Sequence, residues 1–107
     1  MSAGILLALA IVTEVFGTVM LRLSDGMSKL PPTVAMVVGY VVSIGLLAQV
    51  LKQLDIGFAY AVWAGAGTAL IAAIGVAAWD EPITGLKAVS LVAVIAGVVG
   101  LNLSSAH

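Results

Sequence analysis

The chain has 107 residues, of which 63% are hydrophobic and 8% charged, and its formal net charge is −1. Soluble domains carry about 25% charged residues, so this chain cannot cover a water-exposed surface and is predicted to be an integral membrane protein. The near-neutral charge offers no basic surface for nucleic acid, and the absence of cysteine excludes disulfides and thiolate sites.

Four apolar stretches are long enough to cross a bilayer, because a helix needs about 20 residues to span the hydrocarbon core. Each must be helical, since a segment in lipid has to satisfy its own backbone hydrogen bonds. The expected helices are Ser2–Leu21, Val34–Leu51, Gly57–Ala78 and Leu86–Leu103. The predicted fold class is therefore an all-α membrane protein, with a single four-helix domain over residues 1–107.

The connections between these helices are short, so neighbouring helices should run antiparallel and both termini should lie on one side of the membrane. Arg22, Lys29 and Lys87 flank the first and third connections, whereas Lys52 lies at the second. This small bias favours cytoplasmic first and third connections. It is weak enough that insertion in both orientations is compatible with the sequence.

The first span contains one ionisable residue, Glu14, about 10 Å or more from either end at 1.5 Å per residue. A charge at the bilayer centre costs about 2.5–3.5 kcal/mol or more, so this carboxylate should face protein or a water-filled cavity. Burial favours its proton-bound form and a nearby cation favours its ionised form. Glu14 should therefore hold a proton or a cation by turns; the alternative is a neutral, hydrogen-bonded residue within a helix bundle.

The helical face around Glu14 is open on one side, because several of its neighbours at three- and four-residue steps are small. The neighbours are Leu7, Ala10, Ile11, Gly17, Thr18 and Leu21. In the second span, Tyr40 and Ser43 form a polar and aromatic pair that is a weak signal by itself.

The third span places Tyr60, Trp63, Ala64 and Gly67 on one helical face. An aromatic face beside a carboxylate suits an organic cation, because cation–π attraction is worth about 0.5–2 kcal/mol. For Trp63 core packing is an equal alternative, and Tyr60 could lie only at the membrane interface. Gly65 and Gly67 permit either a hinge or close helix packing.

The last span contains small residues at four-residue spacing, the pairs Ala93/Gly97 and Ala96/Gly100, and Ser90 shares the face of Gly97. Such spacing is typical of helix–helix contacts in membranes, and here it is interpreted as a contact between subunits. The spans carry no Ser/His/Asp set and the loop acids are expected to be solvated, so neither a metal site nor an enzyme is predicted. No cofactor is expected.

Together, several motifs resemble those of the small multidrug resistance family, in its quaternary-ammonium-exporting branch, and the resemblance covers essentially the whole chain. They are "TEVFGT" at 13–18, "SDGMSKLPP" at 24–32, "GYVVSIGLLAQVL" at 39–51, "IGFAYAVWAGAG" at 56–67 and "GVVGLNL" at 97–103. The guanidinium-exporting branch typically has a tryptophan shortly after its glutamate. Here Val15-Phe16-Gly17-Thr18 follows Glu14, which favours the drug-exporting branch.

The resemblance implies a proton-coupled antiporter of hydrophobic and quaternary-ammonium cations, working by alternating access as an antiparallel, dual-topology dimer in the bacterial inner membrane. Glu14 would be the shared proton and substrate carboxylate, and Tyr40, Tyr60 and Trp63 would line the cation site. Gly65 and Gly67 match a kink, and the last helix, with Ser90, Ala93, Gly97 and Gly100, matches the dimer contact.

The chain departs from the family pattern at three positions. Ala64 stands where a hydroxyl residue is usual, Ser90 where glycine is usual, and Pro31 where an aromatic is common. A homodimer is expected, with a heterodimeric pair or a guanidinium-type exporter as alternatives. A structural subunit of a larger membrane complex is the alternative from another class, because rotor-type subunits also carry a single intramembrane carboxylate.

Overall fold

In a computed structural model, which describes residues 2–104, the chain forms four helices joined by short loops. They are α1 (Ala3–Leu23), α2 (Leu30–Val50), α3 (Ile56–Trp79) and α4 (Gly85–Ser104). All four are long and apolar enough to cross a membrane, which confirms the predicted four-helix, all-α fold. The predicted domain, residues 1–107, also includes position 1 and positions 105–107, which lie outside the described residues.

The helix ends follow local chemistry. The Ser2 side chain accepts a hydrogen bond from the Ile5 backbone N–H at 3.2 Å and caps the start of α1. The second helix begins at Leu30 rather than at 34, because Pro31 and Pro32 occupy its first turn. Backbone N–H groups have no partner in the helix there, so proline is tolerated.

The helices α1 and α2 form the most closely packed pair. Gly39 of α2 meets α1 so tightly that a Cβ atom there would lie 3.0 Å from the Thr13 carbonyl oxygen and 3.2 Å from the Gly17 Cα. Small residues at such crossings let two backbones approach in lipid, where packing replaces the hydrophobic effect as the driving force. The two helices therefore form one compact hairpin.

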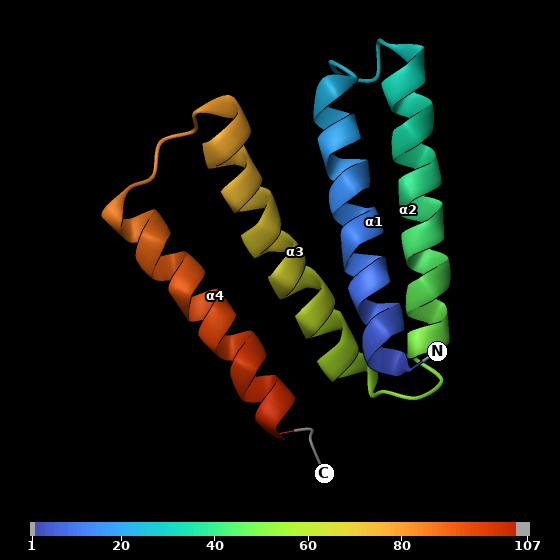
Figure 1. Ribbon diagram of the computed structural model, residues 1–107, viewed down its shortest axis with the longest axis vertical. Coiled ribbons are helices and arrows are strands. Elements are labelled where there is room, and N and C mark those ends of the chain that lie inside the picture. Colours follow the sequence, from blue (N-terminus) through green and yellow to red (C-terminus); the bar gives the residue numbers. More distant parts are fainter. Residues whose placement is uncertain (1, 105–107) are drawn as a thin grey trace.

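The second hairpin, formed by α3 and α4, is splayed away from the first toward one end of the bundle (Figure 1). Helix α3 approaches α1 near the α2–α3 loop and diverges from it toward the other end of the bundle, while α4 lies along the far side of α3. At the contact between α3 and α4, a Cβ atom on Gly65 would lie 2.7 Å from Cγ2 of Val98. No residue of α4 up to Ser104 is buried, so most of its surface is free for lipid or for a partner.

The apolar core lies at the end where α1, α2 and α3 converge. Its buried members are Leu7, Ile11, Val15, Val50 and Ala59. The first residue of α1 and the last residue of α4 also lie at this end (Figure 1), as the short antiparallel connections predicted.

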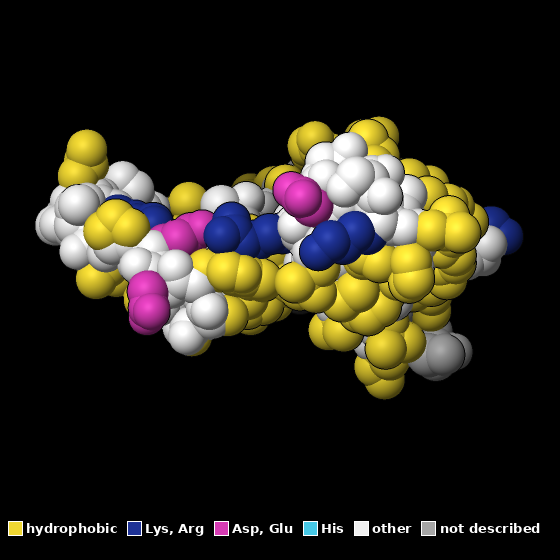
Figure 2. Space-filling view, turned by 90° about the horizontal axis from the view of Figure 1, so that it is seen from above, with side chains coloured by type: hydrophobic (Ala, Val, Ile, Leu, Met, Phe, Trp, Pro, Cys, Tyr) yellow, Lys and Arg dark blue, Asp and Glu magenta, His cyan; other side chains and the backbone are white. Residues whose placement is uncertain are grey.

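The opposite end carries the α1–α2 and α3–α4 loops. Figure 2 views this end and shows acidic and basic side chains side by side across it. Helix α3 stops at Asp80, which has a left-handed backbone conformation with φ of 50°. The next backbone N–H, of Glu81, donates to the Gly75 carbonyl at 3.2 Å, so the chain folds back over the last turns of α3.

Candidate functional site

The Glu14 side chain is half-buried on α1 and faces α3. On α3 it lies beside the buried Gly67, where a Cβ atom would lie 2.9 Å from Oε2 of Glu14. The carboxylate therefore lies directly against the α3 backbone. Any larger residue at position 67 would have to displace it.

The other carboxylate oxygen belongs to a short hydrogen-bonded chain. The Thr18 hydroxyl, one turn further along α1, donates to Oε1 of Glu14 at 3.0 Å. The same Thr18 oxygen lies 2.7 Å from the Tyr40 hydroxyl of α2. Because Thr18 has a single proton and gives it to Glu14, Tyr40 donates to Thr18, and both O–H dipoles point toward the carboxylate.

A second hydrogen-bonded chain fixes the tryptophan. The buried Ser43 hydroxyl donates to the Ala10 carbonyl at 2.6 Å and accepts from the Trp63 indole N–H at 3.2 Å. This single hydroxyl joins α1, α2 and α3. It holds the indole ring beside Glu14, and Tyr60 packs against that ring with centroids 5.7 Å apart and planes tilted by 51°.

These groups surround a hollow of about 270 Å³ lined by Glu14, Tyr40, Ser43, Ile44 and Trp63. On the other side of the carboxylate lies a second hollow of about 350 Å³, which includes Thr18 and Gly67 and extends to Glu81. Glu14 lies between an aromatic compartment and a second one, in which Thr18, Thr68, Glu81 and Lys87 stand among apolar residues. A cation in the first hollow would meet the Glu14 carboxylate, the Tyr40 phenol ring and the Trp63 indole ring. Within the described part of the chain, Glu14 is the one charged residue in the lining of this hollow.

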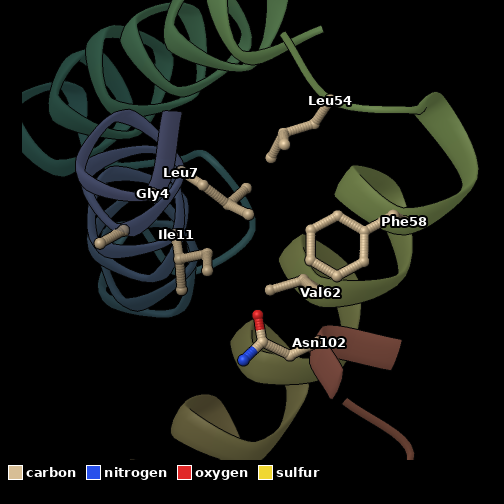
Figure 3. Close-up of a pocket in the computed structure, with 8 residues that line it drawn as sticks. Gly4, Leu7, Ile11, Leu54, Phe58, Val62 and Asn102 are labelled. Atoms are coloured by element: carbon tan, nitrogen blue, oxygen red, sulfur yellow. The ribbon is translucent and has the colours of Figure 1, made fainter. Parts of the chain in front are cut away.

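Several residues predicted for the site lie elsewhere. Leu7 and Ile11 line an apolar hollow of about 380 Å³ between α1, α3 and α4, together with Leu54, Phe58 and Val62. Figure 3 shows their side chains pointing toward one another, with the amide of Asn102 directed into the same space. This hollow lies toward the converging end of the bundle and does not include Glu14.

The remaining predicted residues lie close to the site and support the side chains that line it. Ala10 is fully buried beneath Ser43, to which it offers its carbonyl. Gly17 is buried beneath Tyr40, whose ring would lie 2.7 Å from a Cβ atom at that position. Tyr60 is 58% exposed and touches the site through Trp63.

The two glycines predicted as a hinge face different neighbours. Gly65 meets Val98 of α4, and Gly67 meets Glu14 of α1, while α3 continues without interruption to Trp79. Both glycines permit close packing in this structure; a hinge function stays a prediction.

The predicted dimer face of α4 is directed away from its own protomer. Leu91, Val94 and Val98 lie toward α3 and are half-buried, whereas Ser90, Ala93, Gly97 and Gly100 are exposed. Nothing lies within 4 Å of a Cβ atom built on Gly97 or Gly100.

Sequence reasoning missed Ile44 and Thr68, which line the two hollows, and it placed Glu81 among solvated loop acids. The Glu81 side chain is indeed 41% exposed, but its carboxylate also lies against Gly75. The sequence signal for this contact was Gly75, a residue without a side chain that lies six positions before Glu81 in the last turns of α3. Within residues 2–104, no three His, Asp or Glu side chains lie close enough together to hold a metal ion.

Similarity to known proteins identifies the family. The family model described as Small Multidrug Resistance protein matches residues 3–102. The chain belongs to the small multidrug resistance family. Members of this family are membrane transporters rather than enzymes, and this member is a multi-pass membrane protein.

Three relatives of this small multidrug resistance protein illustrate the range of sequence identity. The nicotine metabolites export pump subunit NepA of Paenarthrobacter nicotinovorans is 50% identical, over 94% of this chain and 86% of the relative. The multidrug resistance protein EbrB of Bacillus subtilis is 46% identical over the same shares. The quaternary ammonium compound-resistance protein QacE of Escherichia coli is 37% identical over the full length of both chains.

Proposed function

We propose that this protein is a proton-coupled antiporter that exports hydrophobic and quaternary-ammonium cations across a bacterial cytoplasmic membrane. The observation that carries the proposal is Glu14, a carboxylate in the middle of a membrane-spanning helix that opens onto a hollow lined by Tyr40 and Trp63. The names of its relatives support the same substrate class, since they include multidrug and quaternary-ammonium resistance proteins.

Competition at Glu14 drives the exchange. A cation with a delocalised or shielded charge gains from the ionised carboxylate and from the aromatic faces. A proton on the carboxylate removes that attraction, so proton and cation each lower the affinity for the other by the same factor. The hydroxyl of Thr18, 3.0 Å from Oε1, supplies a hydrogen bond to the ionised form while the cation is bound.

The site is proposed to be completed by a second subunit. Its hollow of about 270 Å³ lies just below the range of about 300–1,000 Å³ usual for small-molecule sites. Two such hollows facing each other would enclose a drug-sized cation between two Glu14 side chains. The exposed face of α4, with Ser90, Ala93, Gly97 and Gly100, is the proposed dimer contact.

In this proposal the two subunits insert in opposite orientations, so that each is an inverted copy of the other. Alternating access then follows the logic of inverted repeats in larger transporters, in which two halves exchange conformations around a fixed site. Gly65 and Gly67 are the proposed points at which α3 bends during the exchange. A heterodimeric pair is the alternative, and the relative NepA is itself described as a pump subunit.

The decisive experiment is calorimetric titration of tetraphenylphosphonium at a series of pH values from about pH 4 to about pH 9, a range that begins near the ordinary pKa of a glutamate, about 4.3. Cation affinity is expected to fall as the pH drops. Glu14→Gln should abolish both this pH dependence and proton-driven exchange in proteoliposomes. Asp55→Asn, at an exposed loop acid, is the matched control and should leave both intact.

Two outcomes would contradict the proposal. An affinity that does not change with pH would exclude competition at Glu14, and a purified protein that binds no organic cation would favour a structural subunit of a larger complex. Electrophysiology on proteoliposomes with quaternary-ammonium and guanidinium compounds side by side separates the two exporter branches, since the proposed branch transports the former.

A further inference from the structure

We infer that Glu81 is a proton-relay residue, placed at the mouth of a crevice through which protons reach Glu14 from the end of the bundle that carries the α3–α4 loop. The inference rests on the proposed proton-coupled exchange. It adds a second acid and a separate route for the proton, distinct from the aromatic hollow that receives the organic cation.

The local fold directs Glu81 inward. Asp80 ends α3 in a left-handed conformation, and the Glu81 backbone N–H then donates to the Gly75 carbonyl. This turn brings the Glu81 carboxylate into contact with Gly75, where a Cβ atom would overlap it. Gly75 is buried; the absence of a side chain at this position makes the room that the carboxylate occupies.

The crevice connects the two acids. The hollow of about 350 Å³ between α1 and α3 has Glu14 among its lining residues and Glu81 as another. A neighbouring hollow of about 170 Å³ also includes both Thr18 and Glu81. Thr18 and Thr68 line the crevice on the Glu14 side, Lys87 lines it beside Glu81, and apolar residues lie between them. Water in the crevice therefore has polar partners at both ends.

The charged groups around Glu81 come from two helices. Arg22 of α1 lies 3.9 Å from Oε2, and Lys87 of α4 lies 3.9 Å from Oε1. Arg22 also lies over the Trp79 ring, 4.6 Å from its centroid. Glu14 is the other titratable group that α1 contributes to the crevice, and the α3 residues that line it are uncharged.

These contacts position the Glu81 side chain and still leave it accessible to solvent. Both ion pairs are at the long end of the range, and the Glu81 side chain keeps 41% of its surface exposed. Its oxygens can therefore exchange protons with the solution while the carboxylate still faces the crevice. A fully solvated acid would not be held toward the crevice. An acid fully paired with basic side chains would not exchange protons with the solution.

The relay has two balanced steps. A buffer acid or hydronium ion gives a proton to the Glu81 carboxylate, which becomes a neutral acid. That proton then passes through crevice water to the Glu14 carboxylate, Glu81 becomes ionised again, and the organic cation leaves the aromatic side of the now neutral Glu14. The reverse steps return the proton to solution.

The test is a stopped-flow pH jump on the full-length protein in proteoliposomes, which follows release of bound tetraphenylphosphonium. In weak buffer Glu81→Gln should slow proton-triggered release by at least about tenfold, a modest share of the usual gain from positioned proton transfer. Its cation affinity at alkaline pH should equal that of the unmodified protein. Asp80→Asn is the matched control, because asparagine also accepts a left-handed conformation.

A mobile buffer separates a relay from a structural role. High concentrations of imidazole should restore the release rate of Glu81→Gln, because a small diffusible acid can enter the crevice and replace the missing carboxylate. Slow release that imidazole does not restore, or an unchanged rate in weak buffer, would overturn the inference. If Glu81→Gln does not fold, Glu81→Asp, which keeps the acid but shortens it, should show a smaller delay that imidazole also removes.

Failure of the proposed function would look different. In that case the unmodified protein would release no cation after the pH jump, or Glu14→Gln would still do so. Glu81 is judged only where the unmodified protein responds and Glu14→Gln does not.

Discussion

The carboxylate of Glu14 lies against Gly67, with Oε2 2.9 Å from the position that a Cβ atom would take. This contact between α1 and α3 sets where the carboxylate can be. A methyl group at position 67 would push the side chain away from α3, since the end of a glutamate moves more easily than a helix backbone. The position of the Glu14 carboxylate thus depends on Gly67, a residue that has no side chain.

Gly67→Ala should therefore weaken tetraphenylphosphonium binding by about tenfold or more, because misplacement of a charged group by about 1 Å is costly. The free energy of unfolding should not fall, since alanine in a helix is favoured over glycine by about 1 kcal/mol. Binding calorimetry and denaturant titration in detergent measure the two effects.

Gly45→Ala is the control for that substitution, because nothing lies within 4 Å of a Cβ atom at position 45. It should gain the same helix stability and keep normal affinity. Equal affinities in the two variants would show that Gly67 does not position Glu14.

Thr18→Val should weaken cation binding by about tenfold, since hydrogen bonds to charged groups are worth about 1.5–3 kcal/mol. The change removes the donor to Oε1 of Glu14 and also separates Tyr40 from the carboxylate. Valine has nearly the same shape as threonine, so packing is retained. Titration of tetraphenylphosphonium at alkaline pH, where competition from protons is smallest, gives the comparison.

Thr13→Val provides the matched measurement on the same helix. The Thr13 hydroxyl donates only within α1, to the carbonyls of Leu9 and Ala10. Loss of this hydroxyl should change the cation affinity by less than about twofold, because substitutions away from key contacts usually change free energies by no more than about 0.5 kcal/mol. A comparable loss in both variants would point to a general effect on α1 rather than to Thr18.

Ser43→Ala should lower the free energy of unfolding by about 1–3 kcal/mol, because it leaves the Trp63 indole N–H without its partner in a half-buried place. It also removes the hydroxyl that joins three helices. Unfolding in detergent measures the cost, and weaker cation binding should accompany it as the indole loses its fixed orientation. In Thr68→Ala, which removes a hydroxyl bonded only to its own helix, stability should be nearly unchanged.

Gly97→Val tests the proposed dimer face of α4. A branched side chain on an interface built from small residues should prevent close helix approach, so sedimentation in detergent should show monomers. Gly45→Val adds the same bulk at another open position and should stay dimeric. A dimer that survives Gly97→Val would exclude this face as the contact.

Much of the site was predictable because the membrane makes polarity informative. Glu14 was identified by its depth in an apolar span, and Trp63 by the small residues around it. The start of α2 was placed at Val34, four residues too late, although Pro31 and Pro32 suit the first turn of a helix and do occupy it. Glu81 was missed because its direction depends on the turn at Asp80 and on the space at Gly75.

The sequence by itself determined that four helices cross a membrane and that one of them carries a carboxylate at mid-depth. These follow from the cost of polar groups in hydrocarbon, which acts on each span separately. Only the tertiary structure decided that Gly65 faces α4 while Gly67 faces Glu14, and that Ser43 joins Trp63 to α1. In spans that are apolar on every side, hydropathy does not fix how a helix is rotated about its axis, and close packing between helices does.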